Sequence, residues 1–185
     1  EASVFRKLSV WDNVMAILET LPLSRKERAK RAEELLAPFD LMKVAKQPAY
    51  TLSGGERRKL EIARALVRNP AILMLDEPFA GVDPLSVNEI QDIVRRLAAQ
   101  GLGIIITDHN VGETLAIIDR AYLLYEGSIL QSGTPEALAA DDEVRTKYLG
   151  SNFVLKRSDA FLRAEAGGPQ RINTQAEHDA MKAAE

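Results

Sequence analysis

Two short apolar runs, separated by an amphipathic helical segment, constrain the fold of this chain more than any other feature. Residues 71–75 and Gly103–Thr107 lack the alternation of apolar and polar residues that marks a half-exposed strand. Such runs are typical of parallel strands that are buried on both faces. Residues 84–100 between them have apolar side chains at helical spacing, and Gly101 ends that segment. Strand, helix and strand at this spacing predict a βαβ unit and a parallel sheet.

The first part of the chain has the spacing of helices. Residues 12–21 predict one helix and residues 24–39 a second, with Ser24 as its N-cap and Glu27 three residues later. A third helix is predicted from residue 56 to residue 68. The segment from about residue 10 to residue 50 is therefore expected to form a small α-helical subdomain.

The last part of the chain predicts a hairpin followed by a tail. Residues 121–125 and 128–131 flank Glu126-Gly127, a pair that favours a tight turn, and Thr134-Pro135 opens another short helix. Beyond residue 157 the chain becomes polar and is broken by Gly167-Gly168-Pro169. We expect one domain over residues 1–157 and a flexible tail over residues 158–185.

Charge and composition exclude several classes of function. The 185 residues contain no cysteine, so disulfides and thiolate metal sites are excluded. The net charge of −3 gives no basic field that would favour nucleic acid as a direct partner. The apolar runs are too short to span a bilayer, and no signal peptide opens the chain. A cytoplasmic location is the simplest interpretation.

The segment Leu52-Ser53-Gly54-Gly55-Glu56 stands at the start of the third predicted helix. A purely structural interpretation is a capping box, in which Ser53 caps the helix and Glu56 reaches back to it. That interpretation leaves the two glycines unexplained, because each costs about 1 kcal/mol in a helix relative to alanine. Glycine lets a ligand approach bare backbone N–H groups at the positive end of the helix. The segment therefore predicts a site for a terminal phosphate.

Asp76 and Glu77 follow the first apolar run directly. An acidic pair in this position is often only a helix cap or a solvated turn. The carboxyl ends of strands in an open α/β sheet, however, are where such folds bind ligands. One aspartate suits magnesium, which takes hard oxygen ligands and few protein carboxylates. The neighbouring glutamate is placed to polarise a water molecule for attack on a phosphoryl group.

Asp83 and His109 are weaker signals when each is taken alone. Asp83 precedes Pro84 and is well explained as an N-cap before a proline at the first helical position. A lone histidine is more often structural than catalytic. His109, however, follows the second apolar run, which places it at the same sheet edge as the acidic pair. The conjunction of these features along one sheet edge indicates a nucleotide site.

With these residues identified, the chain resembles the nucleotide-binding subunit of ABC transporters from residue 1 to about residue 155. The fold that this resemblance implies is a P-loop NTPase-like α/β parallel sheet core with a small α-helical subdomain. The family's motifs have counterparts in order: the signature at 52–56, with Glu56 where glutamine is common, the Walker B strand at 72–76, the catalytic glutamate at Glu77, the D-loop at 80–83 and the switch histidine at His109.

The resemblance also implies cofactors, partners and roles. ATP and Mg²⁺ are the expected cofactors, and two copies of the chain sandwich ATP head to tail. Polytopic transmembrane subunits are the other expected partners, on the cytoplasmic face of the inner membrane. The implied roles are ATP contact in trans for Ser53, Gly54, Gly55 and Glu56, magnesium binding for Asp76, catalysis for Glu77 and His109, the dimer interface for Asp83, and contact with the membrane subunits for Phe5 and Arg6.

Phe5 is equally compatible with a place in the core of the helical subdomain. A finer resemblance points to the lipopolysaccharide-export ATPases, through residues 1–10, 107–115 and 146–153. Branched-chain amino-acid importer ATPases are the nearest alternative, since they share the signature and the Asp-His pair. A non-transport ABC ATPase that acts on nucleic acid is a second alternative.

One family motif has no counterpart in the printed sequence. The phosphate-wrapping loop, Gly-x-x-x-x-Gly-Lys-Ser/Thr, would precede Glu1, as would the adenine-stacking aromatic residue and the Q-loop glutamine. The resemblance therefore implies an Mg-ATPase for the intact protein. Residues 1–185 alone are expected to bind ATP weakly and not to hydrolyse it, and a naturally truncated, non-hydrolysing binding module is a further alternative.

Overall fold

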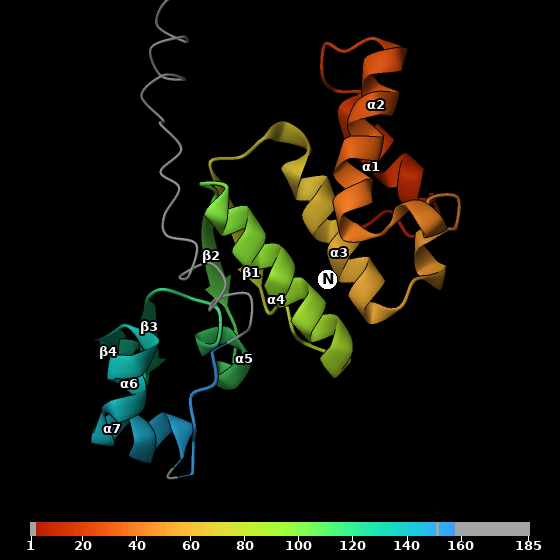
Figure 1. Cartoon of the computed structure of the whole chain (residues 1–185). Coiled ribbons are helices and arrows are strands. Elements are labelled where there is room, and N and C mark those ends of the chain that lie inside the picture. The colour runs from red at the N-terminus through yellow and green to blue at the C-terminus, as the bar shows by residue number, and fades with distance from the viewer. Residues whose placement is uncertain (1–2, 151, 158–185) are drawn as a thin grey trace, which may run out of the picture.

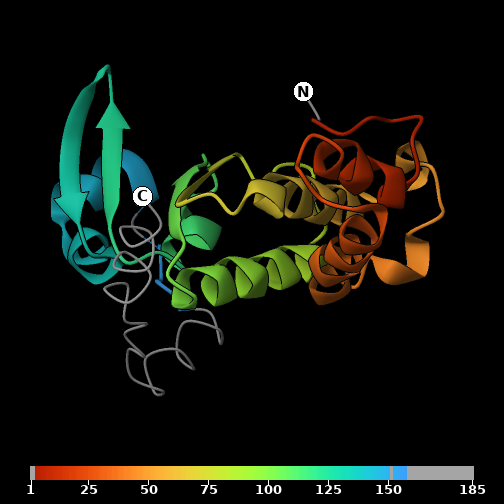
Figure 2. The same ribbon diagram turned by 90° about the horizontal axis from the view of Figure 1, so that it is seen from above.

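The computed structural model describes residues 3–150 and 152–157 of the chain. The predicted flexible tail, residues 158–185, lies outside the described residues. The described part is elongated, with a helical lobe at one end and a β-hairpin at the other (Figures 1 and 2). Two long helices and a pair of parallel strands lie between these ends.

The helical lobe contains α1 (Val10–Leu18) and α2 (Arg25–Leu36). The predicted capping box at the start of α2 is confirmed, because Ser24 accepts from the Glu27 N–H and the Glu27 carboxylate accepts from the Ser24 N–H. Both helices end earlier than predicted. Helix α1 stops before Pro22, whose ring disfavours helical backbone at the residue before it. Short 3₁₀ turns follow α2: η1 (Ala37–Phe39), η2 (Met42–Val44) and η3 (Ala49–Thr51).

The predicted βαβ unit is confirmed. Helix α3 (Gly54–Ala65) and the turn η4 (Leu66–Arg68) lead into β1 (Ile72–Asp76), and α4 (Pro84–Ala99) returns the chain to β2 (Gly103–Thr107). The two strands are parallel and in register from Ile72 with Gly103 to Asp76 with Thr107. Gly101 adopts φ +91°, a left-handed conformation that suits glycine and ends the helix, as predicted.

The expectation that both faces of these strands are buried is wrong for the described residues. Leu73 and Leu75 are buried in the main core, whereas Ile72 and Met74 are 59% and 73% exposed. Strand β2 shows the same alternation, with Ile105 49% exposed. Burial on both faces needs a layer on each side of the sheet, and the described residues supply a layer on one side only.

The chain then forms a second, smaller unit. Strands β3 (Ala121–Tyr125) and β4 (Ser128–Gly133) make the predicted antiparallel hairpin, and its turn residues Glu126 and Gly127 both have positive φ. The remaining elements are α5 (Val111–Leu115), α6 (Pro135–Ala140), α7 (Asp142–Val144) and the π-helical turn η5 (Arg145–Leu149).

Two hydrophobic clusters hold these parts together. The larger runs from Val4 to Ile117 and joins the helical lobe to β1, α3 and α4. The smaller packs the hairpin against α5, α6 and α7 through Leu115, Leu123, Leu138 and Val144. Among the described residues, no helix has both the length and the apolar character that a bilayer span requires.

Candidate functional site

The carboxyl ends of β1 and β2 are joined by hydrogen bonds at the edge of the sheet. The Thr107 hydroxyl donates to the Asp76 carboxylate, and the Glu77 N–H donates to the Thr107 carbonyl at 2.7 Å. Asp76 and Glu77 are both exposed at this edge. The sequence placed the two acidic side chains here, but Thr107, which holds both residues, was not predicted as part of the site.

Glu77 has an unusual backbone conformation. Its φ is +44°, a left-handed value that costs a non-glycine residue on the order of 1–3 kcal/mol. Its carbonyl accepts from Arg58 of α3 at 2.9 Å and from the Ala80 N–H at 3.2 Å, so the peptide is held from both sides. The chain therefore turns sharply after β1 rather than continuing along the strand.

The turn brings Glu77 to His109. The His109 Nδ1 atom lies 3.3 Å from the Glu77 Oε1 atom, and the two side chains are 73% and 54% exposed. A carboxylate facing Nδ1 accepts a hydrogen bond when that nitrogen carries a hydrogen, and the Nε2 side of the ring faces away from this contact. The structure thus pairs the two residues that the sequence analysis selected for catalysis.

Asp108 fixes the backbone on either side of this pair. Its side chain is fully buried, and its carboxylate accepts from the Phe79 N–H at 3.3 Å and from the Asn110 N–H at 2.7 Å. One buried carboxylate therefore joins the turn after Glu77 to the turn after His109. The sequence treated Asp108 only as the neighbour of His109, although an aspartate that bonds the backbone two residues ahead is a recognised turn signal.

The signature segment, residues 52–56, has the predicted capping box. Ser53 accepts from the Glu56 N–H at 3.2 Å, and the Glu56 carboxylate accepts from the Ser53 N–H at 3.0 Å. Gly54 and Gly55 form the first turn of α3. A Cβ atom built on Gly55 would lie 2.3 Å from the Ser86 Oγ and 2.5 Å from the Ser86 Cβ, and one on Gly54 would lie 3.0 Å from the Gly81 carbonyl oxygen.

These contacts give the glycines a structural reason that the sequence did not suggest. Among the described residues, the start of α4 approaches Gly55 most closely, through Ser86. Asp83 caps α4 by accepting from the Ser86 N–H at 3.0 Å. Hydrogen bonding to Ser86, first with its side chain and then with its N–H, lowers the pKa of the Asp83 carboxyl below its usual value. The predicted capping role of Asp83 is confirmed.

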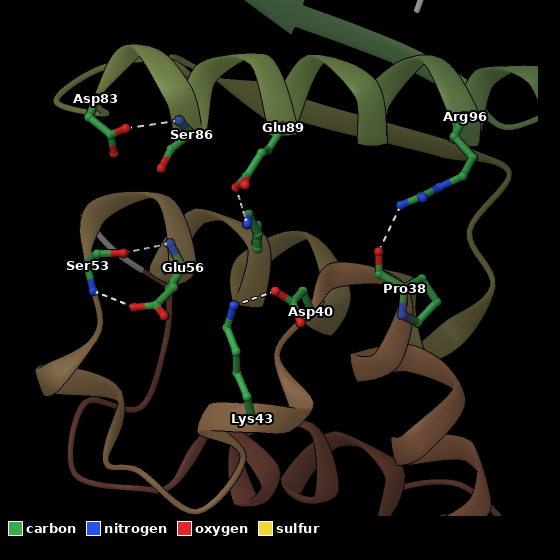
Figure 3. A network of polar contacts seen from close by, with 10 residues as sticks. Pro38, Asp40, Lys43, Ser53, Glu56, Asp83, Ser86, Glu89 and Arg96 are labelled. Carbon is green, nitrogen blue, oxygen red and sulfur yellow. Dashed lines mark hydrogen bonds and ion pairs between the residues drawn. The ribbon is translucent and has the colours of Figure 1, made fainter.

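Helices α3 and α4 run side by side in the same direction, and the caps of both lie at the same end (Figure 3). Gly55 lies against Ser86, and one turn further along Lys59 pairs with Glu89. Both helix N-termini therefore point toward the carboxyl edge of the strands. Each contributes about half a positive charge at its end, which favours an anion there.

A cleft of about 490 Å³ opens beside this edge, between α3 and β1. Acidic and basic groups share its lining, namely Asp76 and Glu77 from the strand end and Arg57 and Arg58 from α3. Within the described residues, no hydrogen bond or ion pair joins residues 53–56 to Asp76 or Glu77. The structure therefore brings together Asp76, Glu77 and His109, while the signature segment packs against the D-loop.

Phe5 and Arg6 lie on the surface of the helical lobe. Phe5 is 50% exposed and is therefore not a core residue, and the Arg64 guanidinium stacks over its ring at 4.7 Å from the centroid. Burial lowers the pKa of Arg64. Tyr50 was not among the residues predicted from the sequence. It lies beside them, because its N–H donates to the Arg6 carbonyl at 3.0 Å, and its side chain is 61% exposed.

The fully buried Asn13 shapes this surface loop. Its Oδ1 accepts from the Phe5 N–H at 2.8 Å, and its Nδ2 donates to the carbonyls of Phe5, Leu8 and Ser9 at 2.9–3.3 Å. We expect Asn13→Ala to lower the free energy of unfolding by about 1–3 kcal/mol, because it leaves the Phe5 N–H without its partner and removes the side-chain bonds to three loop carbonyls. Chemical denaturation of the chain measures this loss. Asn13→Asp keeps one acceptor but loses the donor group, so it should not restore stability; full stability in Asn13→Ala would contradict the assignment.

Comparisons with known proteins agree with these features. Residues 1–80 match the family model described as ABC transporter. The chain is 54% identical over 153 residues to the lipopolysaccharide export system ATP-binding protein LptB of Acidithiobacillus ferridurans, covering 83% of this chain and 64% of that protein. It is 50% identical to LptB of Escherichia coli K12, covering 84% and 65%. A probable ABC transporter ATP-binding protein of Azorhizobium caulinodans is 53% identical, covering 84% and 55%.

Solved structures give the same result. The chain superposes on cbiO1 from Clostridium perfringens, part of the ABC transporter complex cbiONQ, with a TM-score of 0.70 and 30% identity over 78% of this chain and 58% of that one. A dimeric, post-hydrolysis ATP-binding cassette, MJ0796 bound to ADP and Pi, gives a TM-score of 0.63 and 25% identity over 72% and 59%. The chain spans 55–65% of the length of the curated relatives named above. It belongs to the ATP-binding domains of ABC transporters.

Proposed function

We propose that this chain contributes the signature, Walker B, D-loop and switch-histidine regions to the ATP-hydrolysing subunit of an ABC transporter. The observation that carries the proposal is the contact between Glu77 and His109 at 3.3 Å, beside Asp76 at the carboxyl edge of parallel strands. A carboxylate and an imidazole at this edge are suited to activating a water molecule and contacting a phosphate.

Glu77 is the proposed general base. Its carboxylate is exposed to water, and the hydrogen bonds to its backbone aim it away from the strand axis and toward His109. His109 keeps Nδ1 on Glu77, and its Nε2, when it carries a hydrogen, would donate to a phosphate oxygen. The buried Asp108 holds both turns, so the two groups are positioned before a substrate arrives.

Asp76 is the proposed magnesium ligand. One of its carboxylate oxygens accepts from the Thr107 hydroxyl, which fixes the carboxylate and leaves its second oxygen available. The described residues contain no cluster of three or more His, Cys, Asp or Glu side chains able to hold a metal ion. A single carboxylate, that of Asp76, fits magnesium, which is commonly held by one or two carboxylates, water and substrate phosphates. Bound there, the ion would neutralise charge on the phosphates.

The signature segment is proposed to serve the nucleotide of a second copy of the chain. At the N-terminal turn of α3, Ser53 is exposed and Gly54 is half-buried, and backbone N–H groups without helical partners there suit a phosphate. Gly54 lines the same cleft as Asp76 and Glu77, but among the described residues the segment makes no hydrogen bond or ion pair with either carboxylate. The dimeric, nucleotide-bound cassette MJ0796 supports a paired arrangement.

The proposed partners and substrate follow from the relatives. Phe5, Arg6 and Tyr50 form an exposed patch suited to a cytoplasmic segment of a polytopic membrane subunit. Both LptB relatives are named for lipopolysaccharide export, and we propose that substrate for this transporter too. The subunit would then act on the cytoplasmic face of the inner membrane.

A chimera tests the proposal. The N-terminal region of E. coli LptB, where the family resemblance places the phosphate-binding loop, is joined to this chain and expressed in cells depleted of their own LptB. We expect Mg-dependent ATP hydrolysis, co-purification with polytopic subunits, and restored delivery of lipopolysaccharide to the outer membrane. Hydrolysis without restored delivery would refute the substrate assignment alone. Failure of the folded, partner-bound chimera to hydrolyse ATP would refute the catalytic assignment.

A further inference from the structure

Helix α5, directly after His109, is too weak to hold its own position. It has five residues, Val111–Leu115, and includes Gly112 and Thr114, which are poor helix formers. Isolated helices shorter than about 12–15 residues are marginal in water even with good sequences. Its place therefore depends on the burial of Leu115, Ala116 and Ile117 in the two hydrophobic clusters and on groups elsewhere in the fold that bond its backbone.

Arg157, near the C-terminal limit of the described residues, supplies such bonds. Its Nη1 donates to the carbonyl of Leu115 at 3.0 Å and to that of Ile118 at 2.8 Å. Its Nε pairs with Glu136 of α6 at 2.7 Å, and this pairing lowers the pKa of Glu136. The Arg157 side chain is only 13% exposed, so these charge-assisted bonds are made away from most of the solvent.

The carbonyls that Arg157 takes lie at the C-terminal end of α5, where a helix leaves its last carbonyls unpaired. Phe153 from the same segment packs into the smaller hydrophobic cluster. A Cβ atom built on Gly112 would touch the Phe153 ring at 3.9 Å. Residues 152–157 therefore cross both ends of α5 and attach it to α6.

The backbone of α5 continues directly into the switch histidine. The Val111 N–H donates to the His109 carbonyl at 3.0 Å, and the Thr114 N–H to the Asn110 carbonyl at 3.1 Å. The His109 side chain is 73% exposed, so little packing holds the imidazole itself. Its position relative to Glu77 depends on the backbone before it, which Asp108 fixes, and on the backbone after it, which is α5.

Side chains from α4 also bond this region, as Gln91 donates to Glu113 and Arg95 to the Ile117 carbonyl. The bond from Arg95 lies at the same end of α5 as those from Arg157, but the side chains of α4 attach α5 to the βαβ unit, whereas Arg157 attaches it to α6. We propose that residues 152–157 form a strap that positions His109 through α5, with Arg157 as the positioning residue. What His109 does there rests on the proposed function, but the positioning itself does not.

Amide hydrogen exchange of the whole 185-residue chain tests the strap, followed by NMR. In Arg157→Ala, we expect exchange at Thr114, Ala116 and Ile117 to rise about tenfold or more, because their helix loses its terminal bonds. The amide resonances of His109 and Asn110 should shift as well. Arg157→Lys should recover part of the protection. Lys156→Ala, which removes the adjacent exposed charge, should change neither readout.

Exchange and shifts in Arg157→Ala equal to those of Lys156→Ala would overturn the strap. If Arg157→Ala disturbs the resonances of α1–α4, Arg157→Gln is measured in its place, because glutamine keeps most of the aliphatic stem. The same results are expected of Arg157→Gln, and the same result would overturn the strap. No nucleotide enters this measurement, so its result is independent of ATP hydrolysis. In the hydrolysing chimera, Arg157→Ala should lower kcat at unchanged KM for ATP, and Arg157→Lys should restore it; loss of ATP binding instead would contradict a positioning role.

Discussion

Glu77→Gln in the hydrolysing chimera is expected to lower ATP turnover by about 10²–10⁴-fold, the usual contribution of a general base. Glutamine has nearly the same shape and keeps the side chain near His109, but it has no negative charge to accept a proton. ATP binding uses other groups, so it should persist. ATP-bound dimers should therefore accumulate, because the step that normally separates them is blocked.

Single-turnover hydrolysis with labelled ATP measures the rate, and size-exclusion chromatography in ATP measures the dimer. Glu33→Gln is the matched control, since Glu33 is exposed on α2 in the helical lobe. It makes the same chemical change without touching the sheet edge, and should leave turnover unchanged. Turnover of Glu77→Gln within about threefold of the parent would remove Glu77 as the base, whatever the activity of the control.

The features that the sequence predicted well depend on short stretches of chain. Ser24 with Glu27, Ser53 with Glu56, and Asp83 with Pro84 each define a helix start within four residues. Cap chemistry is local, so no tertiary information is needed to recognise it. The sheet edge at Asp76 was predictable for the same reason, since an apolar run that ends on a carboxylate marks its own boundary.

The features that the sequence missed join residues far apart in the chain. Arg58 bonds the Glu77 carbonyl across 19 positions, and Thr107 bonds Asp76 across 31. Neither pairing has a local signal, because each depends on the parallel register of the strands and the packing of α3. The error on strand burial has the same origin. A continuous apolar run predicts that each face has a covering layer, but the run does not contain that layer.

Gly55→Ala is expected to lower the free energy of unfolding of the chain by about 1–3 kcal/mol, the usual effect of overpacking. The added methyl group would lie 2.3 Å from the Ser86 Oγ and 2.5 Å from its Cβ, so rotating the hydroxyl away does not relieve the overlap. Helices α3 and α4 must separate at their N-termini. The contact lies beside Asp83, so the D-loop should move with it.

Gly112→Ala provides a control that is not expected to lower the free energy of unfolding. It makes the same substitution in a helix, but its nearest neighbour, an atom of the Phe153 ring, lies at an ordinary contact distance of 3.9 Å. Alanine is favoured over glycine in a helix interior by about 0.5–1 kcal/mol, so this variant should be unchanged or more stable. Thermal unfolding of both variants separates the effect of crowding from the general effect of replacing glycine.

The double variant Gly55→Ala with Ser86→Gly decides why Gly55 is glycine. Removing the Ser86 side chain makes room for the new methyl group, so the double variant should be more stable than Gly55→Ala alone, although Ser86→Gly by itself weakens α4. Recovery of stability together with ATP hydrolysis in the chimera would assign the glycine to the packing of α3 on α4. Recovery of stability without hydrolysis would show that a bare backbone is also needed at the N-terminus of α3, where a phosphate has to approach. Absence of any recovery would contradict the contact with Ser86 as the cause.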